Sequence, residues 1–138
     1  MVNLDTKFGR KAKRRLKSEQ EIWLTTTGSD GTPQPRPVWF VWDGESFSIY
    51  SQTTAHKLKH IRKNNKVALN FNTGGNDADV VVFHGIAEVD ESAPLPHLNK
   101  PYFKKYSEGI KGLKMTPEKF SAEYPVAIRV TPYSLRGF

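Results

Sequence analysis

Short runs of alternating apolar and polar side chains cover much of this chain and predict β-strands. Residues 21–27, EIWLTTT, are rich in β-forming side chains and lead into a Gly-Ser-Asp-Gly turn. Residues 36–42 and 45–51 form the next two strands, and Asp43-Gly44 joins them in a tight hairpin because both positions tolerate a positive φ. The other predicted strands are 66–72, 79–89 and 126–130, with the tail 131–138 as a further short strand.

Other stretches carry a helical pattern. In residues 5–19, Phe8, Ala12 and Leu16 recur at every fourth position and form a narrow apolar stripe, while cations cover the other faces. In residues 116–124, a Thr-Pro pair gives a typical helix start, with threonine as the N-cap. The remaining predicted helices cover residues 55–64 and 99–113.

Prolines and one glycine indicate how the strands are arranged. Pro33, Pro35 and Pro37 each remove a hydrogen-bond donor on the same side of an extended segment, so this segment lies at a sheet edge or in a bulge. Gly85 suggests a bulge or a sharp bend in its long strand. About six antiparallel strands in one domain predict a mainly β fold, a closed or half-closed barrel with flanking helices. That domain covers residues 1–138.

Composition narrows the range of partners. The 138 residues include no cysteine, which excludes disulfides and thiol chemistry and fits a cytoplasmic setting. No signal segment and no apolar run of membrane-spanning length is present, so we expect no membrane partner. The net charge of +7 favours anionic partners, namely nucleic acid, anionic lipid, or a phosphorylated or carboxylated small molecule. The helix at 5–19 is either a docking helix with a solvated basic surface or an electrostatic collar for an acidic ligand.

A candidate anion site lies where the second hairpin strand ends and the helix 55–64 begins. Ser51, Thr53 and Thr54 place hydroxyl groups beside the N-terminus of that helix, a common arrangement for phosphate binding. Lys57 stands in the first turn, where a cation opposes the helix dipole. An anion between the helix N-terminus and the Lys57 ammonium would explain this placement. The alternative is that Lys57 is one of many solvated lysines.

A second candidate site is the strand that the prolines open. Its free backbone groups could bond to a flat heterocycle with amide-like edges, which would rest on Trp39, Phe40 or Trp42. These aromatic side chains could equally pack in the core or at a dimer interface. His56 and His60 have the spacing of two metal ligands on a helix. No carboxylate accompanies them, and their cationic neighbours would repel a metal ion, so we expect no metal site.

Signatures of self-sufficient catalysis are missing from the sequence. It contains no Ser-His-Asp or nucleophile-elbow pattern, no GxGxxG and no P-loop. Any catalysis would therefore come from a cofactor, with the protein supplying position and electrostatics. Nucleic acid is not expected as a partner either, because the chain has no RNP-type aromatic motif and no recognition-helix pattern.

The order of these features resembles the pyridoxamine 5'-phosphate oxidase-like split β-barrel proteins over most of the chain. The segments that carry the resemblance are WLTTTGSDGTPQPRPVWFVWDGESFSIYSQ, AHKLKHIRKNNKVAL and VVFHGIAEV. Within that family, the pattern looks most like the deazaflavin-dependent branch. The resemblance implies a homodimer that binds coenzyme F420, or FMN in other branches, across the subunit interface.

Departures from the FMN-binding oxidases of this family bear on the cofactor. Arg36 matches the Arg of their R-x-V-L-L-K strand motif, but Val41 stands where that motif has its Lys. Lys57 matches the Lys of their S-R-K motif, whereas His56 replaces the preceding Arg. Their C-terminal pyridoxal-binding pattern is absent. The resemblance therefore implies F420 rather than FMN, and it speaks against pyridoxamine oxidation.

By resemblance, the protein is a deazaflavin-dependent oxidoreductase that transfers a hydride between coenzyme F420 and an unsaturated small-molecule acceptor. The backbone of residues 37–40 would hold the ring edge, residues 51–57 the ribityl phosphate, and the cations of the first helix, with Arg62, would attract the acidic tail. The implied cofactor-binding residues are Arg36, Pro37, Val38, Trp39, Phe40, Ser51, Gln52, Thr53, Thr54, His56, Lys57, Arg62 and Asn72. No residue is assigned as the proton donor. Alternatives are an FMN-binding oxidoreductase of the same fold, a non-catalytic flavin- or haem-binding module, a nucleic-acid-binding protein that acts through the helices at 5–19 and 55–64, and dimerisation alone.

Overall fold

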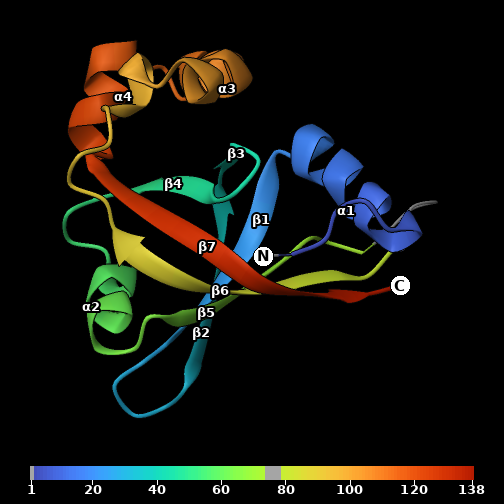
Figure 1. The fold of residues 1–138 in the computed structure, drawn as a ribbon. Helices are drawn as coiled ribbons and strands as arrows, with labels where there is room; N and C mark the ends of the chain where they lie inside the picture. The colour runs from blue at the N-terminus through green and yellow to red at the C-terminus, as the bar shows by residue number, and fades with distance from the viewer. Residues whose placement is uncertain (1, 74–78) are drawn as a thin grey trace.

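The computed structural model describes residues 2–73 and 79–138, which form a curled β-sheet with helices around it (Figure 1). The helices are α1 (Lys7–Ser18), α2 (His56–Lys63), the short 3₁₀ helix η1 (Pro96–Leu98), α3 (Lys100–Gly112) and α4 (Pro117–Glu123). The strands are β1 (Glu21–Thr27), β2 (Pro33–Trp39), β3 (Val41–Trp42), β4 (Phe47–Ser51), β5 (Lys66–Asn70), β6 (Val81–Val89) and β7 (Val126–Gly137).

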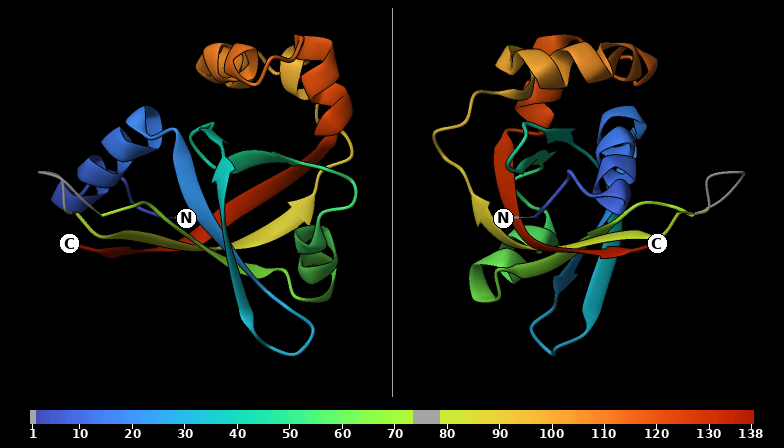
Figure 2. Two further views of the ribbon diagram at one scale, coloured as in Figure 1. Left: turned by 180° about the vertical axis from the view of Figure 1, so that it is seen from behind. Right: turned by 45° about the vertical axis from the view of Figure 1, so that its right-hand side comes forward.

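All seven strands join one antiparallel sheet in the order β2-β1-β5-β6-β7-β4-β3. The sequence predicts about six, and the difference arises because the strand expected at 36–42 divides at Phe40 into β2 and β3. These two strands lie at opposite ends of the sheet order, and in a flat sheet they would be about 29 Å apart. A single residue joins them, so the sheet must curl. The two views of Figure 2 show this half-closed barrel, which confirms the predicted fold class.

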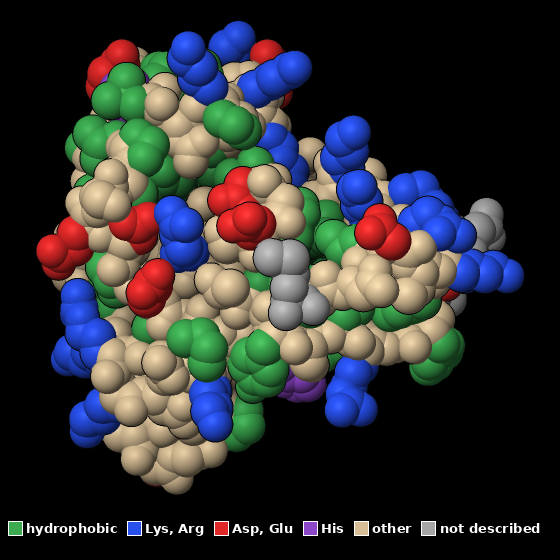
Figure 3. All heavy atoms as spheres, in the orientation of Figure 1, with side chains coloured by type: hydrophobic (Ala, Val, Ile, Leu, Met, Phe, Trp, Pro, Cys, Tyr) green, Lys and Arg blue, Asp and Glu red, His purple; other side chains and the backbone are tan. Residues whose placement is uncertain are grey.

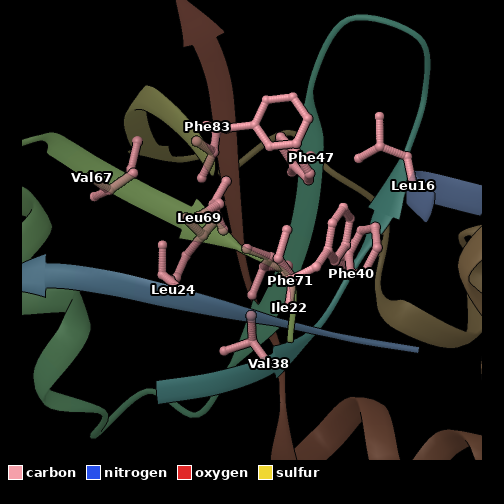
Figure 4. Packing of buried hydrophobic residues seen from close by; sticks show 14 of the residues in the cluster. Leu16, Ile22, Leu24, Val38, Phe40, Phe47, Val67, Leu69, Phe71 and Phe83 are labelled. Atoms are coloured by element: carbon pink, nitrogen blue, oxygen red, sulfur yellow. The ribbon is translucent and has the colours of Figure 1, made fainter. Parts of the chain in front are cut away.

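The barrel interior holds the larger of two hydrophobic clusters. Buried positions alternate with more exposed ones along β1, β5 and β6, and in β1 the inward-facing residues include Ile22 and Leu24. Figure 4 shows how they meet side chains from the other strands, with Phe40, Phe47 and Phe83 among them. The tail expected as a separate short strand instead continues β7 to residue 137.

The predicted irregularity at Gly85 is confirmed. The pairing of β6 with β7 shifts register between His84 and Gly85. A Cβ atom on Gly85 would lie 2.8 Å from a methyl carbon of Val130 and 2.9 Å from the carbonyl oxygen of Thr131. The glycine therefore lets β7 approach closely at the point where the barrel bends.

A second hydrophobic cluster lies outside the barrel, beneath α3 and α4 (Figure 1). Trp39, the last residue of β2, packs against this cluster with its indole flat on the ring of Tyr106, at a centroid distance of 4.6 Å and 4° between the planes. The ring of Phe120 in α4 stacks 5.7 Å from the same indole. Trp39 thus joins the helical part of the molecule to an edge strand of the sheet.

The predicted helix starts are also present. Thr116 is the N-cap of α4, where its hydroxyl accepts a hydrogen bond from the backbone N–H of Lys119, and Pro117 follows as the first helical residue. In α1 the expected stripe faces the barrel, with Ala12 and Leu16 buried. Within the described ranges of the chain, no helix combines the length and apolar character needed to cross a membrane.

Candidate functional site

Helix α2 presents its first turn to the edge strand β2. Leu58 and Ile61 are buried in the barrel core, so they fix which side of the helix faces the sheet. The N-cap residue, Ala55, provides no side-chain hydrogen bond to the first turn. The N–H of Leu58 donates to the Ala55 carbonyl at 3.2 Å, so the N–H groups of His56 and Lys57 are the ones that keep their capacity to bind an anion.

A polar cleft of about 450 Å³ lies between this helix start and β2. The residues that line it come from β1, from β2 and from the start of α2, and four of the eight carry a guanidinium, ammonium or imidazole group. The eight residues are Thr26, Gln34, Arg36, Pro37, Ala55, His56, Lys57 and His60. The donor-rich lining, with no carboxylate in it, fits a phosphate or a carboxylate ligand.

Lys57 is the half-buried cation of this polar cleft. Burial lowers the pKa of its ammonium group below the usual lysine value, and the nearby Arg36 guanidinium lowers it further. Among residues 2–73 and 79–138, no carboxylate lies within ion-pair distance of Lys57 or Arg36. Two cations held close together without an acidic partner repel each other, and an anion placed between them would relieve that repulsion.

The outer edge of β2 carries acceptors without matching donors. β2 is the terminal strand of the sheet and pairs with β1, so that Pro35 lies opposite Thr25 and Pro37 opposite Trp23. A proline has no N–H to exchange with β1, and backbone groups alternate between the two sides of a strand, so the Pro35 and Pro37 carbonyls point to the open edge. The Arg36 guanidinium donates to the Pro35 carbonyl at 2.7 Å, which shows that this oxygen is outside the ladder.

An aromatic cleft of about 290 Å³ adjoins the polar cleft and shares Pro37 and Lys57 with it. Its walls come from β2, from the end of β4 and from the helices α3 and α4. The lining residues are Glu21, Pro37, Val38, Trp39, Tyr50, Lys57, Tyr102, Leu113, Phe120 and Tyr124. A charged recess and an aromatic recess therefore meet at one border, which Pro37 and Lys57 form.

Part of the predicted cofactor-binding set gathers in these two clefts. Arg36, Pro37, His56 and Lys57 line the polar cleft. Val38 and Trp39 line the aromatic cleft, together with the shared Pro37 and Lys57. The strand and the helix that the sequence singles out separately thus lie side by side in the structure.

Other members of the predicted set lie elsewhere. The Phe40 side chain is fully buried in the barrel, and its backbone N–H and carbonyl both bond to the Tyr106 hydroxyl. Ser51 is buried and donates its hydroxyl to the Gln52 carbonyl at 3.0 Å. The exposed turn 52–54 lines neither cleft.

Arg62 and Asn72 are also outside the two clefts. Arg62 lines a separate recess between the end of α2 and β6. The side-chain oxygen of Asn72 accepts from the indole N–H of Trp23 at 2.7 Å, and its carbonyl accepts from Arg15 of α1. These contacts tie Asn72 to the end of the barrel that α1 covers.

The cations of α1 lie at a distance from the polar cleft. Both views of Figure 2 place α1 and α2 on different sides of the sheet, and Figure 3 shows Lys and Arg side chains gathered over the α1 end of the molecule. Two of these cations pair with acids, Lys11 with Asp79 at 3.4 Å and Arg15 with Glu19 at 3.3 Å. Within one chain, α1 therefore does not form part of the candidate site.

Sequence reasoning missed several residues of the clefts. Thr26 is buried at the floor of the polar cleft, where its hydroxyl lies 2.9 Å from Nδ1 of His60. His60 follows Lys57 by about one helical turn. This spacing could have predicted that both side chains lie on the same face of the helix and reach the same cleft. The aromatic wall from Tyr102, Phe120 and Tyr124 had no local signal, because α3 and α4 reach β2 only through the tertiary fold.

Comparisons with known proteins agree with this architecture. The model of the pyridoxamine 5'-phosphate oxidase family matches residues 8–135, so the chain belongs to that family. Among solved structures, an F420 reductase is 27% identical and superposes with a TM-score of 0.71, over 90% of this chain and 94% of that one. The sequence matches no curated protein.

Two more distant structures share the fold. An FAD-binding protein from Mesorhizobium loti is 17% identical, with a TM-score of 0.69 over 93% of this chain and 90% of that one. A haem storage protein from Vibrio cholerae is 14% identical, with a TM-score of 0.66 over 99% of this chain and 95% of that one. The same barrel therefore occurs in proteins named for three different bound groups, and the cofactor has to be argued from the clefts.

Proposed function

We propose that the protein is a deazaflavin-dependent oxidoreductase, which transfers a hydride between coenzyme F420 and an unsaturated small-molecule acceptor. One observation carries the proposal, namely that Pro37 and Lys57 line both the polar and the aromatic cleft. A ligand with an anionic part near Lys57 and a flat ring along β2 would use this border. F420 has both parts, and its ring supplies the hydride chemistry when it is bound.

The polar cleft would hold the anionic part of the cofactor. Arg36 and Lys57 are close enough to lower the pKa of Lys57, and no described carboxylate neutralises either of them. A phosphate between the two cations would gain charge-assisted hydrogen bonds and remove their mutual repulsion. His56 and the N–H groups at the start of α2 would add further donors to the same phosphate.

The open edge of β2 would hold the ring edge. The pyrimidine part of a deazaflavin has an N–H between two carbonyl groups. Along β2 the Pro37 carbonyl is an acceptor at the open edge, and the Pro35 carbonyl beside it accepts from the Arg36 guanidinium. By the same alternation the Trp39 N–H faces the open edge as a donor. Phe40 has no free backbone group, because Tyr106 holds both of them. We therefore narrow the proposed ring contact from residues 37–40 to residues 37–39.

Two observations favour F420 over FMN. Val41, in the hydrophobic cluster beneath α3 and α4, has no side-chain group that could bind a phosphate. The second is the similarity to the F420 reductase, which is 27% identical over 90% of this chain. The remaining members of the predicted set, which include Gln52 and Arg62, would act only on outer parts of the ligand or by long-range attraction.

We further propose that the protein works as a homodimer in the cytoplasm, with the site at the subunit interface. Leu113, at the rim of the aromatic cleft, is 49% exposed, and Leu98 on the same helical side is 61% exposed. A second subunit packed on this side would cover these leucines and exclude water from both clefts. The proposal is tested by sedimentation of the purified protein with and without cofactor, and a monomer in both states would refute it.

Titration with F420 and with FMN tests the proposed cofactor. We expect the protein to bind F420 in preference to FMN, and Lys57→Ala to weaken F420 binding by about 1–3 kcal/mol through loss of a charge-assisted contact. Lys59→Ala is the matched control, because Lys59 is an exposed lysine of the same helix that lines neither cleft. Tight binding of FMN without F420 binding would refute the choice of cofactor. Equal losses in the two variants would remove Lys57 from the site.

A further inference from the structure

The aromatic cleft contains one polar group that the fold does not use. Tyr102 is 1% exposed and lines this cleft. In the described ranges no hydrogen bond includes its hydroxyl, yet no fully enclosed side-chain nitrogen or oxygen there lacks a partner. The hydroxyl must therefore reach open space, and the open space beside Tyr102 is the aromatic cleft.

The hydroxyl groups of the two neighbouring tyrosines, unlike that of Tyr102, have hydrogen-bond partners within the fold. Tyr50 and Tyr106 both pack against the ring of Tyr102 at a centroid distance of 4.8 Å. The Tyr50 hydroxyl donates to the Pro94 carbonyl at 2.6 Å, and the Tyr106 hydroxyl bonds to the backbone of Phe40. Only the Tyr102 hydroxyl of these three remains free for a ligand. Burial raises its pKa, so it stays protonated and can donate.

The walls of the cleft define the shape of the ligand. The Trp39 and Phe120 rings stack with 19° between their planes, and Tyr124 stacks on Phe120 at 28°. Because these rings cover one another's faces, they present mainly their edges to the cleft, and with Leu113 at the rim this aromatic lining favours an apolar ring compound. The volume of about 290 Å³ suits a compound of one or two fused rings.

The charges at the border balance each other. Glu21 and Lys57 line the cleft with one negative and one positive group, so the cleft has no net preference for a charged ligand. The free donor inside it calls for one hydrogen-bond acceptor on the ligand, because a buried donor without a partner costs free energy.

We propose that the aromatic cleft binds a flat, uncharged ring compound with a carbonyl group, and that the Tyr102 hydroxyl donates a hydrogen bond to that carbonyl oxygen. That this compound is the hydride acceptor rests on the proposed function, because the two clefts meet at Pro37 and Lys57. A hydride would add to the far carbon of the double bond conjugated with the carbonyl. The electron pair of that double bond would form the new double bond of an enolate, and the π pair of the carbonyl would move to its oxygen. The Tyr102 hydrogen bond would stabilise the charge on this oxygen until a proton from water completes the reduction, and the cofactor is left oxidised.

Binding to the cofactor-free protein tests this site separately from the proposed function. Chromone, a flat neutral two-ring ketone, is titrated while the tryptophan fluorescence is recorded, since Trp39 forms part of the cleft wall. Naphthalene is the matched probe without an acceptor. We expect Tyr102→Phe to weaken chromone binding by about 3- to 10-fold and to leave naphthalene binding unchanged. Tyr133→Phe removes a hydroxyl from a tyrosine that is 53% exposed and lines neither cleft, and it is expected to change neither affinity.

The carbonyl stretch of bound chromone gives a second measurement that does not depend on the stability of a variant. We expect it to shift to lower frequency in the wild-type protein and to return toward its apolar-solvent value in Tyr102→Phe. Absence of chromone binding, or equal affinity in wild type and Tyr102→Phe with no carbonyl shift, would overturn the inference. Chromone binding without F420 binding would refute the proposed function alone. Arg36→Ala, at a residue that lines only the polar cleft, is expected to lose F420 affinity while keeping that for chromone.

Discussion

The Tyr106 hydroxyl lies 2.8 Å from the backbone nitrogen of Phe40 and 2.7 Å from its carbonyl oxygen. It accepts from the first and donates to the second, or to the Gln20 carbonyl, which is also 2.7 Å away. Phe40 is the residue at which the chain leaves β2 for β3, so neither of its backbone groups has a ladder partner there. A side chain of α3 thus supplies the hydrogen bonds that the sheet lacks at this corner.

Replacing Tyr106 by Phe should destabilise the protein. The ring would remain stacked on Trp39, but the buried backbone groups of Phe40 would lose a partner, at a cost of about 1–3 kcal/mol in the free energy of unfolding. Denaturant unfolding measures the difference. Tyr133→Phe is the control, because Tyr133 is 53% exposed and should change stability by less than about 0.5 kcal/mol. Equal values for the two variants would show that the Phe40 backbone is satisfied in another way.

Lys105 should make stability depend on pH. Its ammonium donates to the Phe40 carbonyl at 2.9 Å, and burial lowers its pKa to about 8 from the ordinary value of 10.5. Between these two values the unfolded chain keeps the proton that the folded chain has lost, so the contribution of Lys105 to the free energy of unfolding rises with pH. Below pH about 8 both states are protonated and the contribution is constant.

The measurement compares denaturant unfolding of wild type and Lys105→Met from pH 7 to about 9.5, below the range in which tyrosines titrate. The difference in stability between the two proteins should change in favour of wild type as the pH rises. The Lys105 side chain is partly exposed, and the solvent screens the effect and keeps it small. Parallel pH profiles would contradict the assignment.

Two glycines should respond to alanine in opposite directions. Gly85→Ala would place a methyl group 2.8 Å from Val130 and 2.9 Å from the Thr131 carbonyl, and the resulting overlap should cost about 1–3 kcal/mol. Gly112 has no atom within 4 Å of the position of an added Cβ, and Gly112→Ala should stabilise α3 by about 0.5–1 kcal/mol. Thermal unfolding of the two variants checks both signs, and a stable Gly85→Ala would mean that the bulge can rearrange.

Lys114 has a left-handed backbone conformation, which is unfavourable for a residue with a side chain. Its φ is 59°, and it follows the end of α3. The N–H of Lys114 bonds to the Lys111 carbonyl, and the N–H of Met115 bonds to that of Ile110, the pattern of a Schellman motif that usually has glycine at this position. Lys114→Gly should therefore stabilise the protein by about 1 kcal/mol, measured by denaturant unfolding. Lys111→Gly, within the helix, should have the opposite sign.

Local pattern was enough to predict much of the scaffold. The alternation in β1, the Gly85 bulge, the cap at Thr116 and the edge position of the proline-rich segment all follow from residues close in sequence. The division of one predicted strand at Phe40 could not be read in this way. It depends on the closure of the whole barrel and on Tyr106, which lies 66 residues further along the chain.

Part of the candidate site could also be predicted from residues close in sequence. Lys57 and the β2 edge could be identified because each breaks a local rule, a cation in a first helical turn and prolines in a strand. Ser51 looked equally suited to a phosphate, but its pairing with Val126 of β7 places it in the sheet, and its hydroxyl bonds to the Gln52 carbonyl. The aromatic wall depends on how α3 and α4 pack on Trp39, which no nearby residue records.

The prolines of β2 have a consequence for how these molecules meet each other in a crowded solution. An exposed sheet edge normally invites a strand from another molecule, and repeated addition of this kind leads to fibrils. Pro33, Pro35 and Pro37 occupy three of the four outward-facing positions of this outermost strand, so at these positions it lacks the donors that an added strand would require. The same residues that keep acceptors available to a small ring compound thus protect the folded chain from aggregating through this edge.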